Sequence, residues 1–175
     1  MTIITISGTP GSGKSTIGKI LKKRLNLNYV YSGQIFRETA KKYKMTLEEF
    51  GRFCENNEKI DRELDKEQLD LLKKGNVILE GRLAGWIAYN NNIKSLKIIL
   101  NADLKIRISR IIEREAGDYN KRLKEILSRE KSEQKRYKKY YNIDIKDTSI
   151  YDLIIDTSNK SPKEIADIIV NKIEK

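Results

Sequence analysis

The chain has 175 residues, which suits one domain with its own hydrophobic core, and its formal net charge is +11. The excess of positive charge favours polyanionic partners such as nucleotides, nucleic acids or anionic lipids. A single cysteine, Cys54, excludes an intramolecular disulfide and suits a reducing compartment, so we expect a cytoplasmic protein. No apolar run approaches the roughly 18 residues of a membrane span, and the absence of histidine removes the commonest general base and metal ligand.

Short β-branched or aliphatic runs alternate with segments of helical spacing along the chain. The runs cover residues 3–7, 29–31, 77–79, 96–100 and 153–155. Capping-box sequences predict helix starts at Thr46 and Ser161. Strands that alternate with helices predict an α/β fold with a five-stranded parallel sheet.

Two polar, all-helical stretches interrupt this alternation. We expect the sheet core to comprise residues 1–31, 75–102 and 150–175, with a helical acceptor-binding insertion at about 32–74 and a helical lid at about 103–141. No repeat, low-complexity tract or flexible linker marks a second domain. We therefore expect one domain, and a monomer.

A glycine-rich segment directly follows the first run and opens a helical segment. Residues 8–15, GTPGSGKS, fit the phosphate-binding loop (P-loop) pattern G-x-x-x-x-G-K-S/T in the context that this pattern requires. We expect Lys14 to reach the β- and γ-phosphates of ATP, Ser15 to bind Mg²⁺, and Thr16 to assist at the α-phosphate. The alternative is an ordinary glycine-rich turn between a strand and a helix.

Polar residues follow the second and third predicted strands, at the sheet edge where parallel α/β folds bind ligands. Ser32, Gly33 and Arg37 follow one strand, and Glu80 and Arg82 end the other. We expect both arginines to bind one phosphate through forked donors, and Glu80 to hold Mg²⁺ through water. The alternatives are surface arginines paired with nearby acids and ordinary polarity at a strand end.

Arginines recur at helical spacing in the predicted lid. Arg107 and Arg110 share one face with Arg114, and Arg129 and Arg136 lie on the next helical stretch. Mobile arginines can neutralise the charge of a migrating phosphoryl group and exclude water. The interleaved acids could instead pair with several of them; these acids are Glu113, Glu115, Glu130 and Glu133.

The lack of histidine fits a phosphate acceptor, because a phosphate monoester is already anionic and needs no base to attack. A hydroxyl acceptor would more often require a carboxylate base, which Asp61 or Asp65 could supply. Small-metabolite kinases therefore stay open as an alternative.

Several segments together resemble the short archaeal-type cytidylate kinases. They are ISGTPGSGKST at 6–16, YSGQIFR at 31–37, LEGRLAGW at 79–86, REKSE at 129–133 and YDLIIDT at 151–157. The resemblance implies ATP-dependent phosphorylation of CMP and dCMP, with the P-loop carrying ATP and with Ser32, Arg37 and Arg82 as acceptor ligands. The chain has no long insert of the kind that larger bacterial cytidylate kinases use to grip cytosine and ribose, so the residues that recognise the base are unassigned.

The motifs and the resemblance together predict four groups of site residues. These are a catalytic group of Lys14, Arg107, Arg110 and Arg129; a nucleotide-binding group of Gly8, Thr9, Pro10, Gly11, Ser12, Gly13, Lys14, Ser15 and Thr16; an acceptor-binding group of Ser32, Gly33, Arg37, Asp61, Arg82 and Arg136; and the metal ligands Ser15 and Glu80.

Two other functions compete with this prediction. An adenylate- or shikimate-kinase-like enzyme would differ only in the acceptor pocket. A nucleotide-gated nucleic-acid binder would explain the charge, but the basic residues are mixed with acids and no nucleic-acid-binding signature occurs. We therefore expect ATP and Mg²⁺ as cofactors and no nucleic-acid partner.

Overall fold

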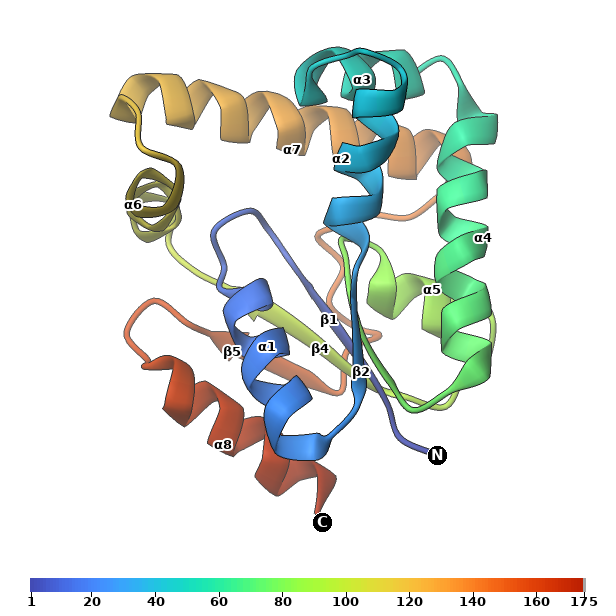
Figure 1. The fold of residues 1–175 in the computed structure, drawn as a ribbon, viewed down its shortest axis with the longest axis vertical. Helices are drawn as coiled ribbons and strands as arrows, with labels where there is room; N and C mark the ends of the chain where they lie inside the picture. Colours follow the sequence, from blue (N-terminus) through green and yellow to red (C-terminus); the bar gives the residue numbers. More distant parts are fainter. Residues whose placement is uncertain (175) are drawn as a thin grey trace.

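The computed structural model describes residues 1–174 and contains a five-stranded, all-parallel sheet with helices on both faces (Figure 1). The strands are β1 (Ile3–Gly8), β2 (Asn28–Tyr31), β3 (Val77–Glu80), β4 (Leu96–Asn101) and β5 (Leu153–Asp156), and their order in the sheet is β2-β3-β1-β4-β5. The predicted α/β class and parallel sheet are confirmed. Residue 175, the end of the expected core range, lies outside the described residues.

Eight helices connect and flank these strands within residues 1–174. They are α1 (Lys14–Leu25), α2 (Ser32–Lys42), α3 (Leu47–Cys54), α4 (Glu58–Lys74), α5 (Ala84–Asn90), α6 (Leu104–Glu115), α7 (Tyr119–Tyr141) and α8 (Pro162–Ile173). Both predicted capping boxes form, because the hydroxyls of Thr46 and Ser161 accept hydrogen bonds from the backbone N–H groups of Glu49 and Glu164. The starts of α3 and α8 are thus set by local sequence.

Each face of the sheet has its own apolar core, because successive side chains of a strand point to opposite faces. Ile4 and Ile6 of β1 pack with Ile17 and Leu21 of α1 and with Ile169 of α8. The opposite face combines Ile3, Val77 and Leu79 with residues of α4, α5 and the end of α7, among them Leu72, Trp86 and Tyr137. The sheet is therefore covered on both sides, as an all-parallel sheet requires.

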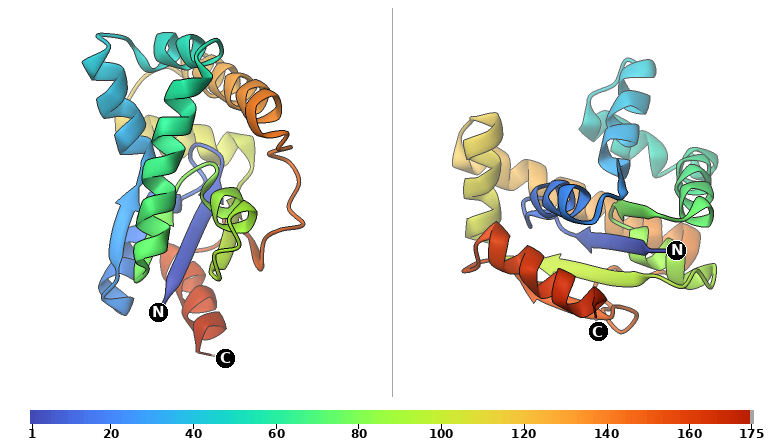
Figure 2. Two further views of the ribbon diagram at one scale, coloured as in Figure 1. Left: turned by 90° about the vertical axis from the view of Figure 1, so that its right-hand side faces the viewer. Right: turned by 60° about the horizontal axis from the view of Figure 1, so that its bottom comes forward.

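Two smaller apolar clusters lie outside this core. One joins Ala40, Phe50 and Cys54 of α2 and α3. The other joins Ile108 and Ile111 of α6 to Ile126 of α7. α7 runs from α6 to the helices α3 and α4 and thus contributes to two clusters (Figures 1 and 2). The expected division into core, insertion and a single lid over 103–141 stays a prediction.

The P-loop and the helices that carry the two small clusters lie at the carboxyl ends of the strands, while the N-terminus and the end of α8 lie at the opposite end (Figure 1). Among residues 1–174, none of the helices combines the length and the apolar character needed to cross a membrane.

Candidate active site

The P-loop connects β1 to α1 through backbone conformations that glycine supplies. Gly8 has φ +142°, and a Cβ there would lie 2.3 Å from the carbonyl oxygen of Leu100. Gly13 has φ +91° and immediately precedes α1, whose first turn carries no side-chain cap. The free N–H groups and the dipole of this helix end therefore form a site suited to a phosphate anion.

Lys14 is held inside the P-loop, where its Nζ donates to the carbonyl oxygen of Thr9 at 2.8 Å. Burial, followed by the positive charge of Arg82, lowers the pKa of Lys14 to about 7, although Glu80 acts in the opposite direction. A nearby phosphate would favour the charged form again. Lys14 is thus placed to neutralise an anionic ligand of the loop.

Ser15, Glu80 and Tyr29 form a connected set beside the P-loop. The hydroxyl of Ser15 donates to Glu80 Oε1 at 2.9 Å, and the hydroxyl of Tyr29 donates to Glu80 Oε2. Burial and the Glu80 carboxylate raise the pKa of Tyr29, so its hydroxyl stays a donor. A hydroxyl and a carboxylate are the oxygen ligands that Mg²⁺ prefers, so these residues fit the metal predicted here.

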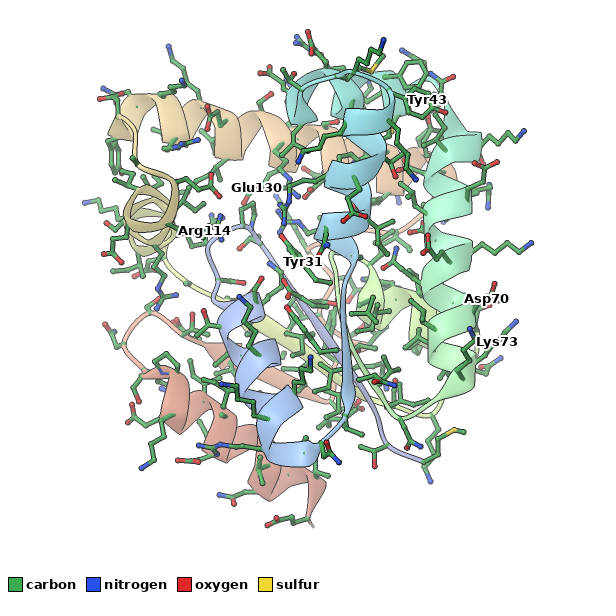
Figure 3. All side chains as sticks on the ribbon, in the orientation of Figure 1. Tyr31, Tyr43, Asp70, Lys73, Arg114 and Glu130 are labelled. Atoms are coloured by element: carbon green, nitrogen blue, oxygen red, sulfur yellow. The ribbon has the colours of Figure 1, made fainter. Side chains whose placement is uncertain are left out.

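The two predicted arginines of α6 also contact the P-loop. Arg107 lies 3.4 Å from the carbonyl oxygen of Pro10 and pairs with Glu130 of α7 at 2.5 Å. Glu130 lies on the side of α7 that faces the P-loop (Figure 3). Arg110 donates to the hydroxyl and the carbonyl oxygen of Thr157 at 2.9 and 2.7 Å. The structure therefore brings both arginines to the predicted nucleotide site.

A cavity lies next to the P-loop, between α2, α4, α7 and the turn after β3. We call it the acceptor cavity, and its lining residues are Ser32, Gly33, Phe36, Asp61, Leu64, Asp65, Gln68, Arg82, Leu83, Arg129, Glu133, Arg136 and Tyr137. Arg82 joins it to the P-loop, because its Nη1 donates to the carbonyl oxygen of Gly8 at 2.5 Å. The P-loop and the acceptor cavity are thus adjacent.

A buried carboxylate organises the arginines of the acceptor cavity. Glu133 Oε2 lies 2.7 Å from Arg82 Nε, and its Oε1 accepts from Arg129 Nε at 2.9 Å. Burial alone would raise the pKa of Glu133, but Arg82, Arg129 and Arg136 together hold that pKa below its ordinary value. Glu133 is therefore ionised and fixes two guanidinium groups at one end of the acceptor cavity.

A second ion pair lies further along α7, between Arg136 and Asp61 of α4. Nearby on α4, Asp65 accepts hydrogen bonds from the Tyr141 hydroxyl and, at 3.1 Å, from the Gln68 amide. Burial raises the pKa of Asp65 to about 6. The acceptor cavity thus has one end lined by arginines and another lined by mixed charges.

Most of the predicted acceptor residues meet in this cavity, but Arg37 does not. Its guanidinium lies 4.8 Å from the ring centroid of Tyr31, and Arg37 is not among the lining residues. Its predicted contact with a phosphate stays a prediction. Two other predicted residues are exposed, Thr16 on α1 and Arg114 on α6 (Arg114 is labelled in Figure 3). Arg114 pairs with the adjacent Glu115.

Sequence reasoning missed several contributors to the site, among them three polar side chains. Tyr137 and Gln68 follow helical spacing like ordinary core or surface residues, and nothing in the sequence places Tyr29 beside Glu80. Glu133 was expected only as an acid that competes for arginines. Glu133 does pair with Arg129, and Glu130 pairs with Arg107.

A parallel sheet in the order β2-β3-β1-β4-β5, a P-loop after β1 and an arginine-lined cavity beside it define a small P-loop kinase. The chain belongs to the cytidylate kinase-like family, whose model matches residues 3–159. It is thus an ATP-dependent kinase, a phosphoryl-group transferase.

Relatives of known name support this assignment. The chain is 47% identical over 173 residues to the cytidylate kinase of Methanocaldococcus jannaschii, covering 98% of this chain and 97% of that protein. It is 44% identical over 172 residues to the cytidylate kinase of Pyrococcus horikoshii, covering 98% and 88% of the two chains.

Solved structures resemble the fold at much lower sequence identity. An uncharacterized protein from Eubacterium ventriosum has a TM-score of 0.74 at 20% identity, covering 100% of this chain and 99% of that one. The shikimate kinase of Aquifex aeolicus has a TM-score of 0.61 at 20% identity, covering 99% and 96%. These likenesses show the shared P-loop kinase fold.

Proposed function

We propose that the protein transfers the γ-phosphoryl group of ATP to CMP and dCMP, which yields ADP with CDP or dCDP. The observation that carries this proposal is Arg82, which lines the acceptor cavity and also donates to the Gly8 carbonyl of the P-loop. A phosphate bound by Arg82 would therefore lie close to the end of a nucleotide held by that loop. The cytidylate kinases among the relatives support the choice of base.

On the donor side, the backbone N–H groups at the start of α1 bind the phosphates of ATP and Lys14 neutralises their charge. Arg107 and Arg110 approach the P-loop from α6 and add positive charge where the migrating phosphoryl group develops negative charge. These residues supply positioning and charge stabilisation, which is most of what phosphoryl transfer requires of a protein.

Ser15 and Glu80 would hold Mg²⁺, Ser15 through its hydroxyl and Glu80 through water. When bound, Mg²⁺ would neutralise part of the negative charge on the phosphates of the nucleotide. The hydrogen bond that Ser15 donates to Glu80 leaves the lone pairs of the Ser15 oxygen free for a cation.

On the acceptor side, Arg82 and Arg129 bind the 5′-phosphate of CMP, with Ser32 and Gly33 beside them. The attacking oxygen belongs to a phosphate that is already anionic, so no general base is needed. Asp61 and Asp65 are then free for a role other than proton abstraction. We further propose a cytoplasmic monomer without nucleic-acid or membrane partners, supported by the single cysteine and by the small-molecule cavity.

One coupled assay of ADP release tests the proposal against its rivals. CMP, dCMP, UMP, AMP, GMP and shikimate are compared by kcat/KM at saturating MgATP. We expect CMP and dCMP to be the best acceptors, UMP to be about 10–10³-fold poorer, and the purine nucleotides to be poorest because of their size. If AMP, UMP or shikimate matches CMP, the cytidylate assignment is wrong, and if nothing is phosphorylated, the kinase proposal itself fails.

A further inference from the structure

The ion pair between Asp61 and Arg136 is buried and incompletely satisfied. The two residues are 5% and 3% exposed, and both line the acceptor cavity. Arg136 Nη1 donates to Asp61 Oδ1, which leaves Asp61 Oδ2 and Arg136 Nε as buried atoms with no hydrogen-bond partner among residues 1–174. Unpartnered buried polar atoms cost free energy. An unpartnered acceptor and an unpartnered donor in one ion pair beside a cavity therefore indicate that a ligand binds there.

The neighbouring carboxylate on the same helix is different. Asp65 also lines the acceptor cavity, but both of its oxygens are occupied, one by the Tyr141 hydroxyl and the other by the Gln68 amide. Asp65 therefore has less capacity for a new hydrogen bond than Asp61. Of the two acids, Asp61 is the one with a free buried oxygen.

The surroundings of the pair suit a flat ring. The Arg136 guanidinium carbon lies 5.4 Å from the ring centroid of Phe36 and 5.5 Å from that of Tyr137, and both rings line the acceptor cavity. Leu64 and Leu83 add apolar surface to the same cavity. A heteroaromatic base would thus find apolar contacts for its faces and polar contacts for its edge.

The spacing along α7 also suits a nucleotide. Arg129, which belongs to the phosphate end of the cavity, and Arg136 are seven residues apart, which corresponds to about 10 Å at 1.5 Å per residue. This is on the order of the span between the 5′-phosphate and the outer edge of the base in a pyrimidine nucleotide. One helix can therefore contact both ends of the acceptor.

We propose that Asp61 and Arg136 recognise the base: Asp61 Oδ2 accepts a hydrogen bond from the 4-amino group of cytosine, and Arg136 Nε donates to cytosine N3. The inference rests on the proposed function and assigns its base specificity. Uracil has a carbonyl oxygen at position 4 and an N–H at position 3, so it would present an acceptor to the carboxylate and a donor to the guanidinium. Both contacts would be lost, and the groups of the pair would stay unpaired.

The test compares Asp61→Asn with the matched control Asp65→Asn, which makes the same chemical change about one turn further along α4. An asparagine at position 61 can accept from cytosine or donate to the uracil carbonyl, so discrimination should weaken. We expect the ratio of kcat/KM for CMP to that for UMP to fall by about tenfold or more in Asp61→Asn, and to stay within about threefold of the wild type in Asp65→Asn. Titration calorimetry with CMP and UMP, without ATP, should show the same change in the ratio of dissociation constants.

The opposite results would overturn the assignment. It is wrong if Asp61→Asn keeps the wild-type ratio, if Asp65→Asn changes the ratio as much, or if the wild type does not distinguish the two nucleotides. A wild type that binds CMP in preference to UMP but phosphorylates neither would contradict the proposed function and leave base recognition measurable by calorimetry.

A second variant guards against a loss of folding. The double substitution Asp61→Leu with Arg136→Met removes both charges together, so no unpaired charge stays buried. We expect this variant to unfold cooperatively like the wild type and to bind CMP and UMP with dissociation constants within about threefold of each other. Retained preference for CMP in the folded double variant would exclude the pair as the specificity determinant.

Discussion

The P-loop takes its residues from one stretch of the chain, 8–15, whereas the acceptor cavity takes them from α2, α4, α7 and the turn after β3. The P-loop offers mainly backbone N–H groups, with Lys14 as its charged side chain. The acceptor cavity depends on side chains that are held by buried ion pairs, with Glu133 between Arg82 and Arg129 and with Asp61 against Arg136. The comparison teaches that the P-loop is built from local backbone, while the acceptor cavity requires tertiary contacts between segments that are distant in the sequence.

The largest effect on activity is expected on the P-loop side, at Lys14. Lys14→Ala should lower kcat by about 10³-fold, because Lys14 stabilises charge on the transferring phosphate, while the fold survives. Single-turnover kinetics and thermal unfolding measure the two effects separately. Full activity in a variant with unchanged thermal unfolding would contradict the proposed role of Lys14 in phosphoryl transfer.

Arg82→Ala should impair the use of CMP and leave the binding of ATP nearly unchanged. A charged, forked hydrogen bond contributes roughly 1.5–3 kcal/mol, so kcat/KM for CMP should fall by about 10²-fold, while the dissociation constant of ATP changes by less than about threefold. Steady-state kinetics with CMP and an ATP titration without acceptor give both values. An equal loss of ATP affinity would show that Arg82 serves the P-loop instead.

Asp65→Asn, in the acceptor cavity, should change how the free energy of unfolding depends on pH. Burial raises the pKa of Asp65 to about 6, above the value of 3.8 that the unfolded chain would have. The fold therefore favours the neutral acid, and the stability that this group contributes is present at low pH and lost as the pH rises through about 6.

Asparagine stays neutral, so Asp65→Asn should escape this loss. Relative to the variant, the wild type should lose about 2 kcal/mol of unfolding free energy between about pH 4.5 and 7.5. Urea unfolding of both proteins at the two pH values is the measurement. Parallel pH dependence in the two proteins would mean that Asp65 is ionised without cost.

The smallest effect is expected at Tyr29, on the metal side of the P-loop. Tyr29→Phe removes one hydroxyl donor from Glu80, so the concentration of free Mg²⁺ at half-maximal activity should rise by about threefold to tenfold, with KM for CMP unchanged. Binding of Mn²⁺ in the presence of ADP gives a readout independent of turnover. Tyr89→Phe, at an exposed tyrosine, is the control and should leave both quantities unchanged.

The sequence predicted where the P-loop lies, because the pattern is contiguous and its context is a strand and a helix that local residues determine. The binding of ATP and Mg²⁺ by these residues stays a prediction. The parallel sheet was also predictable, since five apolar runs alternate with helical segments. Strand order was not part of that prediction. The pairing of β2 with β3 brings Tyr29 beside Glu80, and no local pattern reveals that pairing.

The acceptor side was predicted in part. Arg82, Asp61 and Arg136 were expected as ligands because of their residue type and position, and the structure places all three in the acceptor cavity. The role of Glu133 could not be predicted, because helical spacing pairs it with Arg129 but gives no sign of Arg82, which is far away in sequence. Arg37 was also expected as a ligand because it follows a strand. Its guanidinium instead lies over the Tyr31 ring, and Arg37 is not among the residues that line the acceptor cavity.

The helix α7 extends from the P-loop side of the molecule to the acceptor cavity. Its 23 residues, about 35 Å in length, hold Glu130 against Arg107 near the P-loop and also hold Glu133 and Arg136 in the acceptor cavity. In the proposed arrangement ATP and the acceptor would both meet this helix, so their binding would be thermodynamically linked, and each substrate would change the affinity for the other by the same factor.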